Sequence, residues 1–336
     1  MDQSEMAPLC YAGVASTIVV ALFGLALSAP DALAQARGGF DRTLKVSGAV
    51  TLDVKTGSGS INVQPGPAGA VHVVGRIEAR DSSWGRGPAA AEKIRRLEKN
   101  PPIVQTGDSI RLGEIDDPDL KENVSISFEV TVPKQCRVTS RTGSGSQTIG
   151  DLDGPVDAGT GSGSVRLGSI GGQVEASSGS GSIEAVAVRG DLRAHAGSGS
   201  ISAREVRGAI DASTGSGDIE VTQSGPGDVR VSTGSGSVRL DGIQGPLRVR
   251  TASGSQTVTG TPTGTWDLSC ASGSITLRVP ESAGFDLDAE SHSGSIDSRH
   301  PITMTGRVSR HSLRGQVRGG GPTVRLSAAS GSIRIE

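Results

Sequence analysis

Residues 161–178 read GSGSVRLGSIGGQVEASS, and this stretch carries the pattern that predicts the fold of most of the chain. Val165 and Leu167 flank a polar residue, and Val174 and Ala176 repeat that alternation further along. Successive side chains of a β-strand point to opposite faces, so each alternating run predicts a short strand with one buried face. The Gly-Ser-Gly-Ser run and Gly172 predict the two corners between the strands, because glycine tolerates sharp turns.

The Gly-Ser-Gly-Ser turn recurs at a nearly constant interval. Its central glycine is followed by the next after 18 or 19 residues seven times in succession, and then after 21. Gly331 ends the series after a longer interval of 37, and Gly59 precedes it far upstream. A fixed period of this length is the signature of a repeat architecture. The regular series is Gly145, Gly163, Gly181, Gly199, Gly217, Gly236, Gly254, Gly273 and Gly294.

Two all-β architectures fit a repeat that holds two short strands. In a parallel β-solenoid, or β-helix, each rung stacks on the last and equivalent residues form ladders. In an antiparallel meander, each repeat is a hairpin. The nearly invariant period favours the solenoid, because each rung must match its neighbour's circumference. We therefore predict a parallel β-solenoid of about 18-residue, two-strand rungs over residues 136–336.

Residues 35–135 are predicted to hold N-terminal rungs interrupted by an insertion. Pro88–Asn100, PAAAEKIRRLEKN, predicts one short helix, with a proline near its start and a Pro101-Pro102 stop. Ala90, Ile94 and Leu97 form a short apolar stripe along it. Asp116–Asp119 is predicted to be a loop, because it contains Pro118 and three carboxylates.

The composition limits the class of partner. The chain has 336 residues, 50 glycines, 2% aromatic residues and a formal net charge of −2, which becomes +1 without residues 1–34. A nearly neutral chain has no global field to hold nucleic acid and no polybasic membrane anchor. With so few aromatic residues, the core is predicted to consist of Val, Ile, Leu and Ala.

The first 34 residues are predicted to be a signal peptide. Val14–Leu27 is an uncharged apolar run, and Ala32-Leu33-Ala34 forms a cleavage site before Gln35. The residues before the run contain no Lys or Arg, so a retained anchor is the alternative. We expect export to the periplasm, the cell surface or the medium, with no transmembrane segment after cleavage.

Two cysteines remain after cleavage, Cys136 and Cys270, and they lie about seven rungs apart. At the ~4.8 Å spacing of adjacent strands this is ~34 Å, whereas a disulfide needs Cα atoms within ~7 Å. Both are therefore predicted to be buried fillers.

No motif in the sequence predicts a catalytic, cofactor-binding or metal-binding residue. The serines sit in repeated turns, and the five histidines are scattered, so no Ser-His-acid site is indicated. Only Asp218 enters a turn, unlike the calcium-binding β-roll repeat. We expect a non-enzymatic protein without cofactors. A glycan-cleaving β-helix enzyme is a weaker alternative.

One segment is unusually basic. Arg299–Arg318 holds two histidines and no acid, together with Arg299, Arg307, Arg310, Arg314 and Arg318. These arginines are a candidate patch for anionic glycans or phospholipid head groups. The alternative is a solvated loop within a long last repeat.

The strand VSISFEVTVP, the run VTSRTGSGS, the repeated rungs and the final RGGGPTVRLSAASGSIRIE resemble the bacterial putative-adhesin family, a β-strand-repeat family of unknown function. The resemblance covers Phe40–Glu336 and implies a solenoid-like protein of the cell envelope or medium. It brings no catalytic residues. The function it implies is an adhesin or envelope interaction module whose partner is a protein or glycan. An envelope-stress sensing module is the alternative, and the oligomeric state is open.

Overall fold

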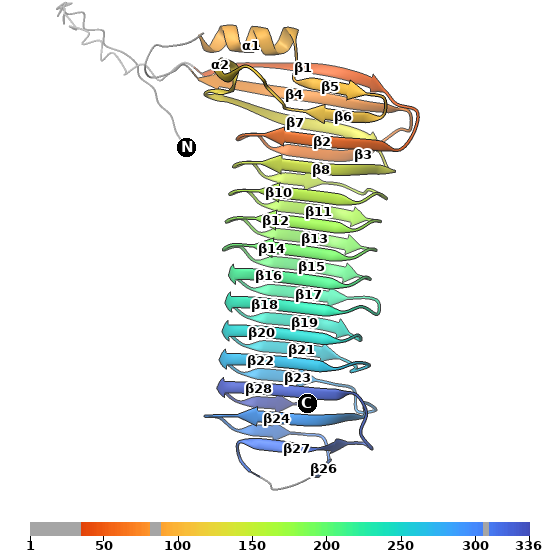
Figure 1. The fold of residues 1–336 in the computed structure, drawn as a ribbon, viewed down its shortest axis with the longest axis vertical. Helices are drawn as coiled ribbons and strands as arrows, with labels where there is room; N and C mark the ends of the chain where they lie inside the picture. Colours follow the sequence, from red (N-terminus) through yellow and green to blue (C-terminus); the bar gives the residue numbers. More distant parts are fainter. Residues whose placement is uncertain (1–34, 81–88, 305–308) are drawn as a thin grey trace, which may run out of the picture. The chain divides into compact units, whose positions relative to one another are not determined.

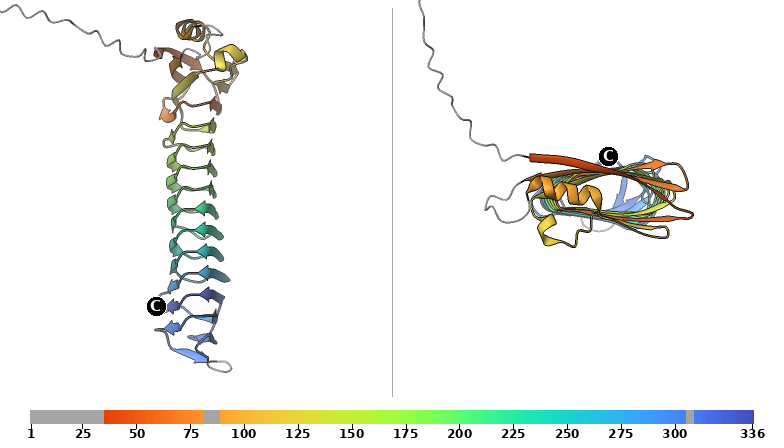
Figure 2. Two further views of the ribbon diagram at one scale, coloured as in Figure 1. Left: turned by 90° about the vertical axis from the view of Figure 1, so that its left-hand side faces the viewer. Right: turned by 90° about the horizontal axis from the view of Figure 1, so that it is seen from above.

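The computed structural model describes residues 35–80, 89–304 and 309–336. The predicted signal peptide therefore lies outside the described residues. The described residues form two facing β-sheets. In the stack the strands of the two sheets alternate along the chain, so that one strand from each sheet makes a rung (Figures 1 and 2). The predicted parallel β-solenoid is confirmed.

Sheet A has 14 strands. In spatial order they are β1 (Gln35–Lys45), β4 (Ala70–Arg80), β7 (Val124–Pro133), β3 (Ile61–Gly66), β9 (Gln147–Ile149), β11 (Val165–Ile170), β13 (Ile183–Val188), β15 (Ile201–Val206), β17 (Ile219–Gln223), β19 (Val238–Ile243), β21 (Gln256–Gly260), β23 (Ile275–Arg278), β29 (Ile333–Ile335) and β25 (Ile296–Ser298).

Sheet B has 15 strands. In spatial order, starting from the opposite end of the stack, they are β26 (Ile302–Met304), β27 (Ser312–Val317), β24 (Phe285–Ser291), β28 (Thr323–Ser330), β22 (Trp266–Ser272), β20 (Leu247–Ser253), β18 (Val229–Ser235), β16 (Ile210–Ser216), β14 (Leu192–Ala196), β12 (Val174–Ser178), β10 (Val156–Thr160), β8 (Cys136–Thr142), β2 (Val50–Thr56), β6 (Ser109–Leu112) and β5 (Ile103–Thr106).

The core lies between the two sheets and consists of columns of equivalent residues. In sheet B, Val156 pairs with Val174, which pairs with Leu192, one repeat apart each time. In sheet A, Val165 pairs with Ile183, and all these side chains are buried. The alternation predicted from the sequence is therefore the inward and outward alternation of the strands. The register shifts at two places in sheet A: Val206 pairs with Gln223 beside β17, and Ile243 pairs with Gly260 beside β21.

The central glycines of the turns form a continuous column. A Cβ on Gly163 would overlap the carbonyl oxygen of Gly145, and a Cβ on Gly181 would overlap that of Gly163. The same overlap recurs at every central glycine from Gly145 to Gly273. Glycine is therefore required at this corner because the backbones of adjacent rungs approach too closely for any side chain.

The N-terminal end departs from chain order. The rung β2–β3 lies directly against β8–β9, although Gly66 and Cys136 are far apart in sequence. The chain between them runs outward through β4, α1 (Ala90–Lys99), β5, β6 and α2 (Pro118–Lys121) and returns through β7. Helix α1 lies across this end of the stack, with Ile94 and Leu97 buried (Figure 2).

The insertion holds two helices among the described residues, whereas the sequence predicted one. The predicted loop at Asp116–Asp119 overlaps α2, so that expectation was wrong in part. The Asp117 side chain accepts a hydrogen bond from the Asp119 N–H (2.9 Å) and so caps a four-residue helix that begins at Pro118. Neither helix of the described residues has the length and hydrophobicity needed to cross a membrane.

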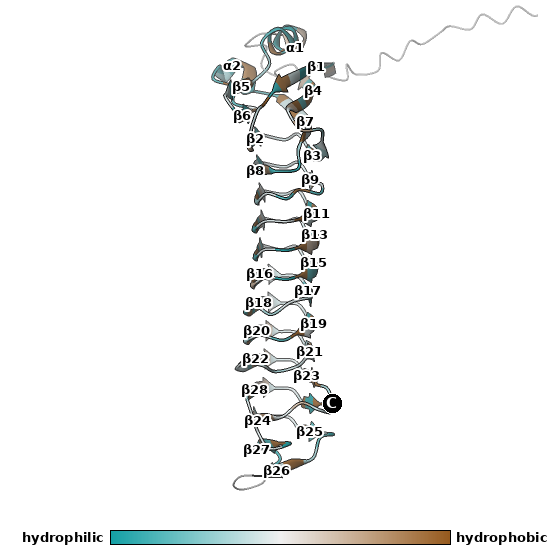
Figure 3. Cartoon of the chain, turned by 90° about the vertical axis from the view of Figure 1, so that its right-hand side faces the viewer, coloured by the Kyte–Doolittle hydropathy of each residue, from teal (hydrophilic) through white to brown (hydrophobic). Residues whose placement is uncertain are grey.

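The C-terminal end departs from chain order as well. β28–β29 is the last rung in sequence, yet it lies between β22–β23 and β24–β25 (Figure 3). Gly331 consequently lies against Gly273, and Gly294 lies against Gly331. The last two intervals of the glycine series, 21 and 37 residues, depart from the regular period. The glycine column is nevertheless continuous in space, because Gly331 lies between Gly273 and Gly294.

Candidate functional site

A trough of about 990 Å³ crosses the strands of sheet B near one end of each strand, towards the C-terminal end of the stack. It begins at Thr214 on β16, crosses β18, β20, β22, β28 and β24 in spatial order, and ends at Ser312 on β27. Its volume lies at the upper end of the range of ligand sites in proteins. Because it crosses several rungs, its shape suits an extended ligand.

The trough floor is lined by small side chains. Ser269, Cys270 and Ala271 come from β22, while Ser327 and Ala328 come from β28. In the middle of the stack the first residue of the turn is glycine. Along the trough it becomes alanine and then histidine, at Ala252, Ala271, Ala329 and His292. The trough therefore combines hydroxyl groups with a small apolar corner.

The trough has a basic side. Arg250 is exposed on its lining, and His292 and His311 stand at the end formed by the C-terminal rungs. One acid, Glu290, also lines the trough, and it pairs with Arg314 (2.6 Å). Asp267, on the same sheet but outside the lining, pairs with Arg248 (3.6 Å). Arg250 has no ion-pair partner among the described residues, so its charge is available to an anionic group.

Two of the five arginines of the candidate patch are engaged in ion pairs. Arg314 forms ion pairs with Asp288 (2.8 Å) and Glu290, and the hydrogen bond to Asp288 is the first cause of its raised pKa. Arg299 pairs with Glu336 (3.6 Å). Arg310 and Arg318 are exposed, and Arg307 lies outside the described residues. The segment contributes His311 and Ser312 to the trough, a placement that no pattern in the sequence indicates.

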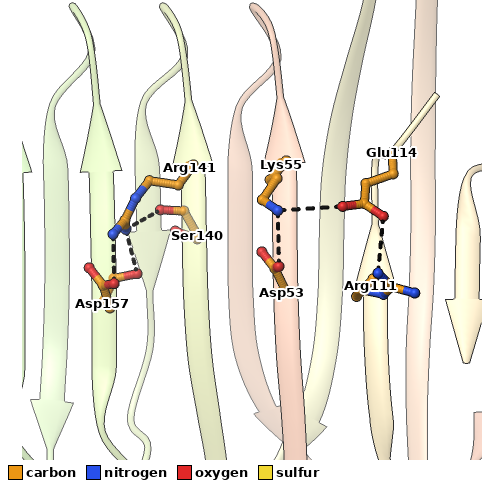
Figure 4. A network of polar contacts seen from close by, with 7 residues as sticks. All are labelled: Asp53, Lys55, Arg111, Glu114, Ser140, Arg141 and Asp157. Atoms are coloured by element: carbon orange, nitrogen blue, oxygen red, sulfur yellow. Dashed lines mark hydrogen bonds and ion pairs between the residues drawn. The ribbon is translucent and has the colours of Figure 1, made fainter. Parts of the chain in front are cut away.

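A second concavity, of about 710 Å³, lies at the N-terminal end of sheet B. Its lining includes Lys55, Glu114, Lys121 and Arg141. Lys55 pairs with Asp53 (3.2 Å) and Glu114 (3.5 Å). Arg141 pairs with Asp157 (2.6 Å), as Figure 4 shows.

These contacts raise the pKa of both basic groups. For Lys55 the largest cause is the hydrogen bond to Asp53, and for Arg141 it is the hydrogen bond to Asp157. Lys55 and Arg141 are thus neutralised by acids of the protein itself, so neither charge is available to a ligand in this second concavity.

The residue before most turns forms a hydroxyl ladder that the sequence analysis missed. The Thr160 hydroxyl donates to the carbonyl of Gly145 (3.0 Å) and accepts from the N–H of Gly163 (3.0 Å), which joins two rungs. Thr142 and Ser178 make the same pair of bonds. The signal was present in the sequence, because Thr or Ser precedes the turn in most repeats. These hydroxyls are engaged in hydrogen bonds between adjacent rungs and are not free nucleophiles.

Both cysteines are buried and free. Cys270 occupies a position of the hydroxyl ladder, and its Sγ lies 3.3 Å from the Gly254 carbonyl oxygen. Burial raises the pKa of the Cys136 thiol to about 12. Within the described ranges no group of three or more His, Cys, Asp or Glu side chains could hold a metal ion.

The stack of two-strand rungs matches a known family. A family model described as Toastrack DUF4097 matches residues 122–336. The chain belongs to this family. The Toastrack match includes β7 and the whole stack from β8 onward, and it confirms the predicted resemblance to a β-repeat family of unknown function. A search among curated proteins gave no match.

Three solved structures are similar to this Toastrack chain, and each comparison covers 89% of it. One is a putative cell adhesion protein from Clostridium sporogenes (11% identity, 99% of that chain, TM-score 0.26). The second is a putative adhesin from Bacteroides fragilis (13%, 97%, 0.30). The third is a putative lipid binding protein from Parabacteroides distasonis (14%, 96%, 0.36). At these identities and TM-scores the three names carry no argument about function.

Proposed function

We propose that this chain is a non-enzymatic, exported interaction module of the cell envelope that binds an anionic glycan along the trough of sheet B. The observation that carries the proposal is the trough itself, in which one arginine without an ion-pair partner and two histidines border a run of small hydroxyl-bearing side chains. The acid on its lining, Glu290, is paired with Arg314. Hydroxyl groups suit the hydroxyls of a sugar chain, and a guanidinium group suits a carboxylate or sulfate.

The rung spacing supports an extended ligand. Adjacent strands of a sheet are ~4.8 Å apart, so equivalent side chains recur along the trough at that distance. Ser232, Arg250, Ser269 and Ser327 are lining residues at equivalent outward positions of four successive strands, so the column carries three hydroxyl groups and one guanidinium group. A polymer with a regular repeat can therefore make the same kind of contact with several rungs, so that individually weak contacts add together.

A binding role also agrees with how the serines and threonines are used. Those that recur in each repeat either join adjacent rungs or lie exposed in a column. We therefore assign no reaction to them. Screening polysaccharides for cleavage products tests the enzymatic alternative, and turnover by the purified chain would replace the binding role with a catalytic one.

The test of the proposal is glycan binding by residues 35–336, measured by calorimetry against an acidic and a neutral polysaccharide. Arg250→Gln should weaken binding of the acidic polysaccharide by about tenfold, because a charge-assisted hydrogen bond is lost. The matched control is Arg193→Gln, which removes an exposed arginine from sheet B outside the trough. Equal losses in the two variants, or equal binding of both polysaccharides, would contradict the proposal.

A further inference from the structure

The last rung in sequence fills a slot between two earlier rungs. β28 pairs in parallel with β22 on one side and β24 on the other, and β29 pairs with β23 and β25 (Figure 1). The preceding strand, β27, pairs with β24 and β26 and makes no ladder with β28. The rung is thus held by the slot and not by its neighbours in sequence.

The slot is specific for this rung. Val324, Leu326, Ile333 and Ile335 are all buried in it, each 1% exposed or less. Gly331 fits directly against the Gly273 carbonyl, where any Cβ would overlap, and its φ of +146° disfavours other residues. A two-strand segment must therefore have a buried apolar alternation and a glycine at the corner to enter the slot.

Backbone and charge contacts also bridge the slot on both sides. The Gly273 N–H donates to the Ser330 carbonyl (2.9 Å), and the Ile333 N–H donates to the Ser295 carbonyl (2.9 Å). The Glu336 carboxylate pairs with Arg278 (3.3 Å) on one side and Arg299 (3.6 Å) on the other. An empty slot would leave two facing rows of unpaired backbone groups, which is a template for strand addition.

The link to this rung is built as a hinge. Gly319, Gly320 and Gly321 join β27 to β28, with φ angles of +86°, +81° and +152°. Each lies in the region that favours glycine, and the three together have few conformational restrictions. The link crosses over β24, because β27 and β28 lie on opposite sides of that strand.

We propose that β28–β29 is an exchangeable rung, and that the slot accepts the same rung from a second copy of this chain to give a domain-swapped dimer. The occupant is a second copy because the slot requires this apolar pattern and this corner glycine, and each rung from β2–β3 to β22–β23 already lies between two neighbours of its own. Exchange keeps every ladder and ion pair and changes only the path of the hinge.

The first test mixes two populations of the full chain that carry different affinity tags. They are incubated together at high concentration in mild denaturant, returned to buffer and separated by size. We expect a dimer peak in which mixed-tag dimers approach about half, as random pairing requires. Deleting Gly319–Gly321 leaves only three Cα–Cα spacings of ~3.8 Å between the end of β27 and the start of β28. This link can barely cross β24 within one chain, so the variant should be mainly dimeric. A wild-type chain and a hinge variant that are both folded and monomeric would overturn the proposal.

The second test uses the wild-type chain and does not depend on any variant folding. A labelled peptide of residues 319–336 is present during the same treatment, and a peptide carrying Gly331→Val is the matched control. Retention of the first peptide but not the second after gel filtration supports an exchangeable rung. Equal retention of both peptides, or of neither, overturns it.

Discussion

The middle of the stack and its two ends are built from the same kind of rung but follow different rules of order. From β10 to β23 each strand pairs with the equivalent strand one repeat away, so order in space equals order in sequence. At the ends, β2–β3 and β28–β29 each lie inside a cap formed by other parts of the chain. Local repetition therefore determines the middle, whereas contacts between residues far apart in sequence determine the ends.

The difference also shows in how tightly the corner glycines are packed. Within the stack, glycines at the turns face the backbone of the previous rung. Gly57, in the first turn of the chain, has no atom within 4 Å of where a Cβ would lie. In this first turn the strict requirement therefore holds for the central glycine, Gly59, which would overlap the Ile126 carbonyl, but not for Gly57.

The largest effect is expected for a side chain in the glycine column. Gly181→Val places a Cβ and two methyl groups against the Gly163 carbonyl, so the rungs must separate. We expect a loss of more than ~3 kcal/mol in the free energy of unfolding, or failure to fold. The control is Gly57→Ala, which should change stability by less than ~0.5 kcal/mol in denaturant titrations. Similar losses in both variants would refute the packing argument.

A smaller effect is expected for the hydroxyl ladder. Thr160→Val keeps the shape of the side chain but leaves the Gly145 carbonyl and the Gly163 N–H without this partner. An unpaired buried polar group costs ~1–3 kcal/mol, so we expect a loss of about 2 kcal/mol in chemical unfolding. Thr148→Val, at an exposed position of β9, is the control. If the control lost as much, β-propensity and not the ladder would be the cause.

The sequence predicted the middle of the fold because its determinants are local. Alternation around Val165 and Val174, with glycine corners at a fixed period, predicts two strands per rung and parallel stacking. It did not predict that Gly331 lies between Gly273 and Gly294, since that order depends on which distant rung fills a slot. Helix α2 was missed because Pro118 and its acidic neighbours are common both to loops and to helix starts.

The candidate site was less predictable than the fold. The arginine-rich segment was noticed, but its charge is partly neutralised by Asp288 and Glu290, which come from a strand that precedes it in the chain. The trough depends on side chains from seven strands, none of which is unusual alone. The change from glycine to alanine at Ala252, Ala271 and Ala329 was visible in the sequence. Only the structure shows that these three residues lie on adjacent strands and line the same trough.

The smallest effect tests the junction between β8 and the displaced rung β2–β3. Cys136 pairs with Val50 across this junction, and burial raises its pKa from an ordinary value of 9.0 to about 12. Between these values the unfolded chain loses the thiol proton and the folded chain keeps it. Stability should therefore fall as pH rises above 9, by ~1.4 kcal/mol per pH unit from this group.

Cys136→Val is the matched variant, because valine already occupies the paired position in β2. Unfolding of both proteins is compared at pH 8 and pH 10, so that other groups titrating at high pH cancel in the difference. We expect the wild-type chain to lose about 1.4 kcal/mol more than the variant over this range. Equal losses would mean that water reaches Cys136, and hence that the junction between β2 and β8 is looser than the ladders in the middle of the stack.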